Sequence, residues 1–490
     1  MMRDIRPFSS GTSKFASVPL ALFTTAMLST LLAGQSDALA ASFPDALLTT
    51  PGTPDVVAKG LETDGYQLAV SAYIWGYPLV RMERTMREYT DVPSPKPPTS
   101  YRAPLDTIGW ATELASPDAK DMPTANNDTY YMSAVVKLDE PWIFTVPDTH
   151  DRYYVVDVFD MYQELEHYIG RRTTGTKAGR YALVPPGWKG TLPTGVKRLD
   201  VSTNKVWLWG RLRVLPGESP AHLAALQKQF KLVPLSAINK TNYVPPKASL
   251  EPLPAIDGDE LGFFVHLGEA VKLNPIKPAD QALFAQFARI GLTKQGLDPS
   301  KLDPAVRKGM VRGLADAPAV AVASLASTSS KRNGWDWVTG LDSFGYNYPL
   351  RAVVAGPYLG GNGEKEAMYP IRYSDSDGKA LDGANKYVIK FDSLPPVNAF
   401  WSITMYNAGD KMLVPNEIKR YKVGSDTQGL VKAADGSVTI PIQHTKPTGD
   451  AAANWLPAPE GGFYVILRMY QPSDDILSGK WQIPELKRVP

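Results

Sequence analysis

The 490-residue chain is predicted to be mainly β: two antiparallel β-sandwich domains, with an N-terminal helix and a helical middle segment. Two blocks of short strands, rich in aromatic and β-branched residues and separated by Gly and Pro, favour sandwiches or barrels. Between the blocks, apolar residues recur at helical spacing. We expect a leader at 1–40, a helix and first β domain at 41–215, helices at 216–330 and a second β domain at 331–490.

The composition is that of an ordinary globular protein. Hydrophobic residues make up 43% and charged residues 21%, and 52 Lys and Arg nearly balance 50 Asp and Glu. This balance gives no electrostatic case for a nucleic-acid partner. Cysteine is absent from the sequence, which excludes disulfides, thiol nucleophiles and cysteine-based zinc sites.

The first forty residues have the pattern of a secretory signal peptide. Arg3, Arg6 and Lys14 precede a largely apolar stretch at 15–32, and an A-x-A motif ends at Ala40. We expect cleavage after Ala40 and a periplasmic or secreted protein. No later stretch reaches about 18 uninterrupted apolar residues, so we expect no stable membrane insertion.

Residues 61–90 are predicted to form the N-terminal helix. One apolar face is formed by Tyr66, Ala69, Val70, Tyr73 and Ile74. Gly76 and Pro78 are expected to break this helix. Residues 91–125, rich in Pro, Ser and Thr, are expected to be an irregular connection.

The strands of the first β block are predicted from period-two patterns and aromatic runs. They are expected at 142–146, 152–162, 181–184 and 206–209. Residues 216–330 then have helical spacing, with N-cap and N1 signals at Ser219-Pro220 and Asp303-Pro304. The strands of the second block are expected at 386–391, 399–406, 437–442 and 462–470, with turn signals between them.

Several motifs resemble two families named as domains of unknown function. The motifs Tyr73–Leu79, Asn127–Tyr131, Arg152–Tyr154 and Gly170–Gly175 resemble domain of unknown function 1254. The motifs Tyr387–Phe391, Leu394–Pro396, Phe400–Ser402 with Met405–Tyr406, and Asn454–Pro457 resemble its usual companion, domain of unknown function 1214. The resemblance implies two jelly-roll-like domains around a helical segment, and often export. It implies no agreed reaction.

A polar cluster precedes the strand that begins near residue 129. Asn127, Asp128 and Thr129 are typical of a tight turn, because Asn and Asp cap their own backbone. The functional alternative is a polar cluster at the mouth of a β domain. In that alternative, Asp128 acts as acid, base or ligand, and Tyr131 contributes its hydroxyl.

Two carboxylates lie within an apolar strand. Asp157 and Asp160 should be exposed, paired or functional, because an unpaired buried charge is costly. We expect ion pairs with Arg152, Arg171 or Arg172. Glu164, Glu166, His150 and His167 lie nearby and would suit a divalent ion, but no metal-spacing motif occurs, so no metal and no cofactor are predicted.

The segment 170–176 and the abundant aromatic residues offer binding groups. Arg172 would bind an anion, or belong to a hairpin with structural ion pairs. Tyr154, Trp401 and Tyr406 belong to the family-like motifs and would either contact a ligand or fill the β cores. Arg351, Tyr369 and Arg468 are candidate polar partners of these aromatic residues.

Two functions of different classes follow. In the first, the protein binds a small polar or anionic ligand in a cleft of the β domains, and acid–base chemistry by Asp128 or Asp157 with Tyr131 would process it. Asn127, Thr129, Tyr154, Arg172, Trp401 and Tyr406 would bind the ligand. In the second, the protein is a non-catalytic envelope or assembly protein. Whether it is an enzyme stays open, and self-association into a homo-oligomer is expected.

Overall fold

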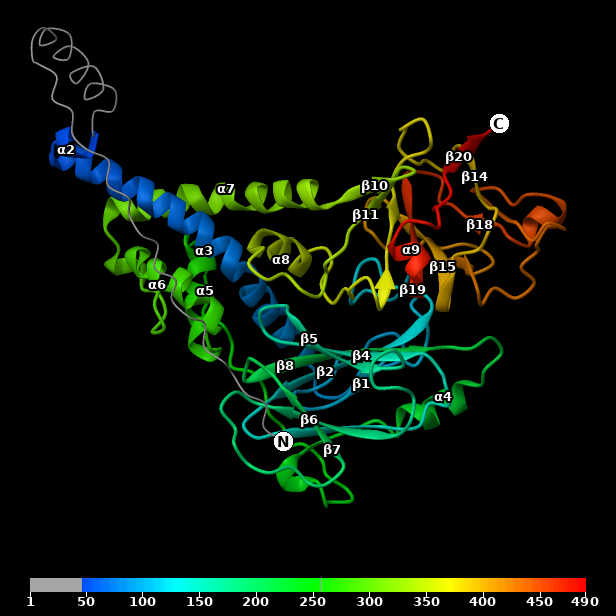
Figure 1. Cartoon of the computed structure of the whole chain (residues 1–490), viewed down its shortest axis with the longest axis horizontal. Coiled ribbons are helices and arrows are strands. Elements are labelled where there is room, and N and C mark those ends of the chain that lie inside the picture. The colour runs from blue at the N-terminus through cyan, green and yellow to red at the C-terminus, as the bar shows by residue number, and fades with distance from the viewer. Residues whose placement is uncertain (1–45, 257) are drawn as a thin grey trace, which may run out of the picture. The chain divides into compact units, whose positions relative to one another are not determined.

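The computed structural model describes residues 46–256 and 258–490, so the expected signal peptide lies outside the described residues. The chain divides into a unit at Met1–Val57 and a unit at Ala58–Pro490. In the first unit the described elements are helix α2 (Ala46–Thr49) and the first residues of helix α3 (Pro54–Thr90). The second unit contains both β blocks and the other helices (Figure 1).

The first β block contains two sheets. A five-stranded sheet has the order β1-β2-β8-β4-β5, and a four-stranded sheet has the order β7-β6-β3-β9. The pairs are antiparallel except β6 with β7. The strands are β1 (Gly109–Trp110), β2 (Thr129–Lys137), β3 (Trp142–Val146), β4 (Tyr154–Phe159), β5 (Leu165–Gly170), β6 (Gly179–Val184), β7 (Val196–Asp200), β8 (Lys205–Arg213) and β9 (Lys231–Pro234). Strand β9 carries this block beyond the boundary expected at residue 215.

One apolar core lies within the first block and draws on both sheets. Met132 and Leu208 come from the five-stranded sheet, whereas Phe144 and Leu183 come from the four-stranded sheet. All four side chains are fully buried. Burial of these alternating residues explains why the period-two pattern located the strands.

The second block also contains two sheets. A seven-stranded sheet has the path β10-β11-β13-β19-β15-β16, with β12 paired to β19, and a four-stranded sheet has the order β18-β17-β14-β20. All pairs are antiparallel except β17 with β18. The elements are β10 (Ser330–Arg332), β11 (Trp335–Trp337), β12 (Ala367–Met368), β13 (Ile371–Arg372), β14 (Lys386–Phe391), β15 (Val397–Asn407), β16 (Lys422–Gly424), β17 (Val438–Gln443), η5 (Gly449–Ala452), β18 (Leu456–Pro457), β19 (Phe463–Pro472), α9 (Asp474–Leu477) and β20 (Leu486–Val489).

Helices fill most of the segment between the blocks. They are η1 (Leu235–Ala237), α5 (Gly262–Leu273), η2 (Pro278–Asp280), α6 (Gln281–Gln286), η3 (Phe287–Ile290), η4 (Pro299–Lys301) and α7 (Pro304–Thr328). Two more helices lie within the blocks: α4 (Pro220–Gln227) precedes β9 in the first, and α8 (Tyr348–Ala355) lies between β11 and β12 in the second. The predicted caps are present, since Ser219 accepts a hydrogen bond from the Ala221 amide and Asp303 accepts one from the Ala305 amide. The mainly β class, with helices between antiparallel sheets, is confirmed.

Helix α3 does not end where the sequence predicted. Pro78 lies inside it, and the helix continues to Thr90. Trp75, Leu79 and Met82 around the proline are all fully buried. Tertiary packing therefore outweighs the local cost of proline, which lacks an N–H to donate within the helix.

Helices α3 and α7 pack closely because α7 has glycines at the contact. A Cβ on Gly309 would lie 2.0 Å from the Glu62 carbonyl oxygen, and one on Gly313 would lie 2.6 Å from the Tyr66 carbonyl oxygen. By length and composition, Pro304–Ala326 in α7 would be able to cross a membrane, and 28% of an 18-residue window within it is buried.

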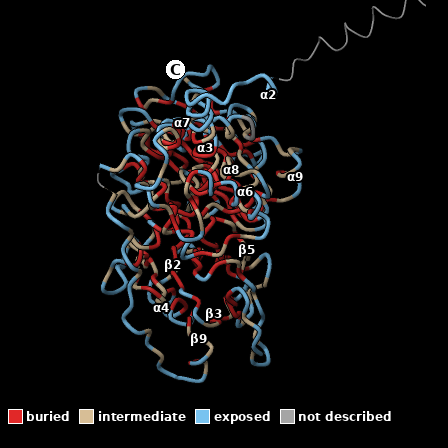
Figure 2. The backbone as a smooth tube through the Cα atoms, turned by 90° about the vertical axis from the view of Figure 1, so that its left-hand side faces the viewer, coloured by how far each residue is buried: buried red, intermediate tan, exposed pale blue. Residues whose placement is uncertain are grey.

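A second large core joins the helices to both β blocks. It contains Trp75 of α3, Tyr131 and Trp209 of the first block, and Tyr406 and Ile466 of the second. In Figure 2 buried backbone runs from the region of helices α3 and α8 to strands β2 and β5. The two blocks therefore share one continuous interior, and the candidate site lies in its wall.

Candidate functional site

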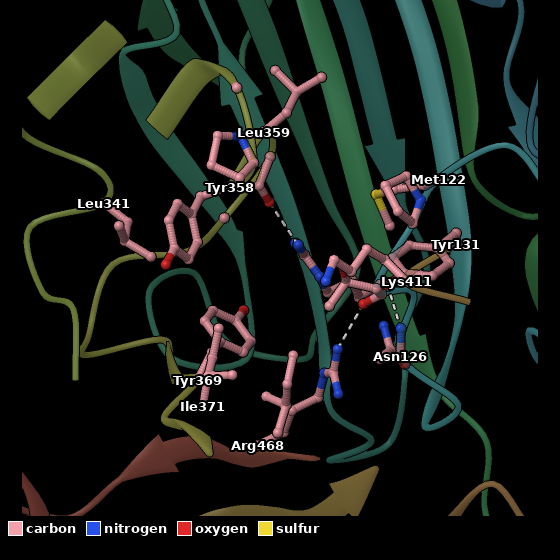
Figure 3. Close-up of a pocket in the computed structure, with 18 of the residues that line it drawn as sticks. Met122, Asn126, Tyr131, Leu341, Tyr358, Leu359, Tyr369, Ile371, Lys411 and Arg468 are labelled. Atoms are coloured by element: carbon pink, nitrogen blue, oxygen red, sulfur yellow. Dashed lines mark hydrogen bonds between the residues drawn. The ribbon is translucent and has the colours of Figure 1, made fainter. Parts of the chain in front are cut away.

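A cavity of about 300 Å³ lies between the two β blocks. Its walls come from α3, the segment before β2, strands β2 and β8, the loop after α8, and strands β13 and β19. Figure 3 shows Leu341, Tyr358 and Tyr369 on one side, and Met122, Tyr131 and Lys411 on the other. Small-molecule sites commonly have this concave, mixed apolar and polar character.

Arg211 of β8 is held rigidly at the cavity wall. Its Nη1 donates to Asp157 Oδ2 at 2.6 Å, and its Nη2 donates to the Gly360 carbonyl oxygen at 2.7 Å. Asn362 Nδ2 donates to both Asp157 oxygens at 2.9 Å, and Tyr369 donates to Asn362 Oδ1 at 2.7 Å. The chain Tyr369–Asn362–Asp157–Arg211 therefore fixes two cavity side chains.

Asp157 lies behind this wall and is fully buried. Burial raises the pKa of the Asp157 carboxyl to about 7, although the hydrogen bonds from Arg211 and Asn362 act in the opposite direction. The Asp157 carboxyl therefore titrates near neutral pH. It reaches the cavity only through Arg211 and Asn362.

Arg468 of β19 is a buried cation with unused hydrogen-bonding capacity. Its Nη2 donates to the Thr124 carbonyl oxygen at 2.7 Å, and its guanidinium lies 5.4 Å from the centre of the Tyr406 ring. Its Nη1 is buried and has no hydrogen-bond partner within residues 46–256 and 258–490. A buried donor without a partner is costly and is rare in folded proteins.

Tyr131 of β2 supplies a second unused donor. Its hydroxyl oxygen accepts a hydrogen bond of 3.0 Å from the Asn126 amide, and no described residue accepts the hydroxyl hydrogen. Its ring stacks on Trp209 with 4.7 Å between ring centres. The ring is thereby fixed while the hydroxyl hydrogen stays available to a ligand.

The cavity lining has an excess of positive charge. Arg81, Arg211, Lys411 and Arg468 line it, against the single carboxylate of Asp121, which pairs with Arg102 at 3.1 Å. Of the four cations only Arg211 has a carboxylate within 4.0 Å among the described residues. This arrangement favours an anion.

The structure places Asp128 just behind the cavity, in contact with the second block. Asp128 is 1% exposed, and its carboxylate accepts hydrogen bonds from Lys422 and from Ser402. Tyr470, which lines the cavity, donates to Asp128 Oδ2 at 3.4 Å. Burial and the Asp128 carboxylate raise the pKa of Tyr470, so this hydroxyl stays protonated.

The other sequence-predicted site residues are not gathered in this cavity. Asn127 donates to the Ala115 carbonyl oxygen, Thr129 donates to Asn126 Oδ1, and Tyr154 donates to the Gly175 carbonyl oxygen. Arg172 pairs with Glu366. Trp401 lies in the core of the second block, and Tyr406 donates to the Ala125 carbonyl oxygen. Among the predicted residues, Tyr131 alone lines the cavity.

The ion pairs expected for the strand carboxylates have to be corrected. Asp157 pairs with Arg211, and Asp160 pairs with Lys277. Arg152 pairs with Glu218, and Arg171 pairs with Asp151, while Arg171 also donates to Gln471 Oε1 at 2.8 Å. The expectation assumed partners close in sequence, whereas β8 brings Arg211 alongside β4 in the same sheet.

A second, more open hollow of about 530 Å³ is lined by Glu164, Glu166, His167, Lys277 and Asp342, among others. Burial and the neighbouring Asp160 raise the pKa of Glu166 to about 7. Among the described residues, no group of three or more His, Asp or Glu has an arrangement that would hold a metal ion. The acidic lining of this second hollow contrasts with the cationic lining of the first cavity.

Sequence reasoning missed the loop that closes the cavity and undervalued one arginine. Residues 356–361 line the cavity, and nothing in their pattern indicated this. Arg468 and Tyr369 were expected only as partners of aromatic residues. Arg468 had a usable signal, because it is a lone cation within the apolar run Phe463–Tyr470.

The fold and cavity define a protein of two β blocks with a cationic pocket between them. Residues 105–234 match the family described as protein of unknown function DUF1254, and residues 366–474 match the one described as protein of unknown function DUF1214. The chain therefore carries a segment of each of these two families, as its motifs predicted.

The fold is similar to that of a solved structure. The VPA0106 protein from Vibrio parahaemolyticus is 26% identical, with a TM-score of 0.66 over 87% of this chain and 100% of that chain. An uncharacterised protein from Burkholderia cenocepacia is 15% identical, with a TM-score of 0.43 over 88% of this chain and 94% of that chain. No curated protein matches this chain.

Proposed function

We propose that the protein binds a small organic anion in the cavity between its β blocks. The observation that carries this proposal is the buried Arg468 Nη1, which has no hydrogen-bond partner among the described residues. An anionic oxygen would satisfy it with a charge-assisted hydrogen bond. The cationic excess of the lining supports the same conclusion.

If the bound anion is also processed, Tyr131 is the predicted catalytic residue that lines the cavity and retains an available proton. Asp128 and Asp157 would act through Tyr470 and Arg211, as positioning residues. This assignment keeps the acid–base chemistry expected from the sequence but gives its direct step to a tyrosine hydroxyl.

We further propose that each β block is a sandwich of jelly-roll type. We also propose that the protein is exported and self-associates, as the sequence predicts. Support for the sandwich comes from cores that draw on two sheets in each block. For export, the support is the leader pattern that ends at Ala40. For self-association, which an assembly role would require, the support is the jelly-roll architecture itself, because such domains commonly tile surfaces.

Native mass spectrometry of the gently purified protein tests the binding proposal. We expect a discrete organic adduct on each protomer, lost in Arg468→Met. The matched control is Arg420→Met, because Arg420 donates to three backbone carbonyl oxygens in the second block and does not line the cavity. A wild-type protein without adduct that also takes up no added benzoate or phosphate would contradict the proposal.

A further inference from the structure

We infer that the ligand is an aromatic monocarboxylate, bound with its carboxylate at the buried floor of the cavity and its ring against the apolar side. This inference rests on the proposed function and adds the chemical class of the anion. Three features carry it: the depth of the polar groups, the free donors and the single cation of the floor, and the composition of the opposite wall.

The polar groups of the cavity differ in depth. Asn126, Tyr131 and Arg468 are 2%, 6% and 4% exposed, and they form the floor. Lys411 and Pro123 are exposed, and Tyr373 is 47% exposed, so these residues form the mouth. An anionic group at the floor would be shielded from water, which strengthens its attraction to the guanidinium.

The floor offers three side chains with unused hydrogen-bond donors to a ligand. Among the described residues, no partner takes a hydrogen bond from Arg468 Nη1, from the Tyr131 hydroxyl or from Asn126 Nδ2, whereas Asn126 Oδ1 already accepts from the Asp128 and Thr129 amides. A carboxylate can accept from all three, because its two oxygens offer about four lone-pair sites. Arg468 is the one cation among these three residues, so a monoanion matches the charge of the floor, whereas a phosphate would bring more negative charge into a buried site.

The opposite side of the cavity is apolar and aromatic. Leu341, Tyr358 and Tyr369 lie across the cavity from Tyr131 in Figure 3, and the Arg468 guanidinium points toward the Asn126 and Tyr131 side. Tyr369 is fixed by its hydrogen bond to Asn362. Fixed tyrosine rings favour a flat aromatic body, because offset stacking and edge contacts add to simple burial.

The volume admits one ring and one carboxylate. About 300 Å³ lies at the lower end of the range for small-molecule sites, which is about 300–1,000 Å³. A carboxylate bound at the floor would place the attached ring beside the apolar wall. The ligand is therefore amphipathic, with one anionic end and one apolar end.

Isothermal titration calorimetry on the purified protein tests this class with benzoate, benzamide, cyclohexanecarboxylate and inorganic phosphate. We expect benzoate to bind at least tenfold more tightly than benzamide, which lacks the charge, and at least threefold more tightly than cyclohexanecarboxylate, which lacks the flat ring. Arg468→Met and Tyr131→Phe should each weaken benzoate at least tenfold, and Arg420→Met should not.

The outcomes separate the class from the proposed function. If phosphate bound more tightly than benzoate and depended on Arg468, the aromatic monocarboxylate would be wrong and anion binding would stand. Equal affinities for benzoate and cyclohexanecarboxylate would overturn the aromatic assignment. If no anion bound the folded wild-type protein, or if benzoate bound Arg468→Met unchanged, both the class and the proposed function would fail.

Discussion

The Ser402 hydroxyl donates a hydrogen bond of 2.7 Å to the Asp128 carboxylate, across 274 residues of sequence. This bond joins the turn before β2 to strand β15, and Lys422 of β16 pairs with the same carboxylate. The polar cluster found at the start of a strand in the sequence is therefore a junction between the two β blocks. Its position behind Tyr470 places it next to the cavity.

Asp128→Ala should destabilise the protein by about 3–5 kcal/mol, because it leaves Lys422 without its partner at a largely buried position. Asp139→Ala is the matched control: its pair with Lys137 is exposed on both sides and should contribute no more than about 1 kcal/mol. Urea unfolding measures both. Equal and small losses in the free energy of unfolding of the two variants would show that the junction contributes little to stability.

Asp128→Asn separates a structural role from a direct contact with ligand. Because Asp128 does not line the cavity, we expect the affinity for benzoate to change less than threefold. If the affinity fell as far as in Arg468→Met, Asp128 would contact the ligand, as the sequence suggested.

The free energy of unfolding of Asp157→Asn should increase relative to that of the wild type as the pH rises from about 4 to 7. Burial raises the pKa of Asp157 to about 7 in the folded protein, above the ordinary value of about 3.9. Its contribution to stability is therefore fully present below pH 4 and is lost as the pH rises toward 7. The free energy of unfolding of both proteins, compared at pH 4.5, 6 and 7.5, checks this. A pH-independent difference would mean that the Arg211 pairing dominates.

Gly360→Ala should disturb the cavity loop more than an ordinary positive-φ substitution. Gly360 has φ +71°, and an added Cβ would lie 2.9 Å from the Trp209 ring. Gly217 has φ +73° with open space around it, so Gly217→Ala isolates the conformational cost of roughly 1–2 kcal/mol. We expect Gly360→Ala to lower the stability of the protein more than Gly217→Ala does, and to weaken benzoate binding. Thermal unfolding measures the first effect, and calorimetry measures the second. Equal effects of the two substitutions on stability and on benzoate affinity would show that the loop accommodates the added methyl group without disturbing the site.

Strands with a buried, alternating face were predictable from the sequence. The predicted segment 386–391 coincides with β14, and 462–470 lies within one or two residues of β19. Strands such as β7, whose residues are mostly half-buried or exposed, carry no such pattern and were missed. The continuation of α3 past Pro78 was also unpredictable, because it depends on long-range packing.

The candidate site was only partly predictable, because a site between two blocks depends on long-range pairing. Asp128 and Tyr131 were found from a local polar and aromatic motif. Arg468 lies more than 300 residues further along the sequence and reaches the Thr124 carbonyl oxygen only in the folded chain. A rule that treats any lone cation in an apolar strand as a candidate would have selected it.

A crystal structure of the protein with 4-bromobenzoate tests the central claim most directly. The anomalous signal of bromine locates the ring independently of the carboxylate. We predict one bromine peak in the cavity beside Leu341 and Tyr358, with a carboxylate oxygen about 3 Å from Arg468 Nη1. Bromine peaks only outside the cavity, at saturating ligand, would contradict the account.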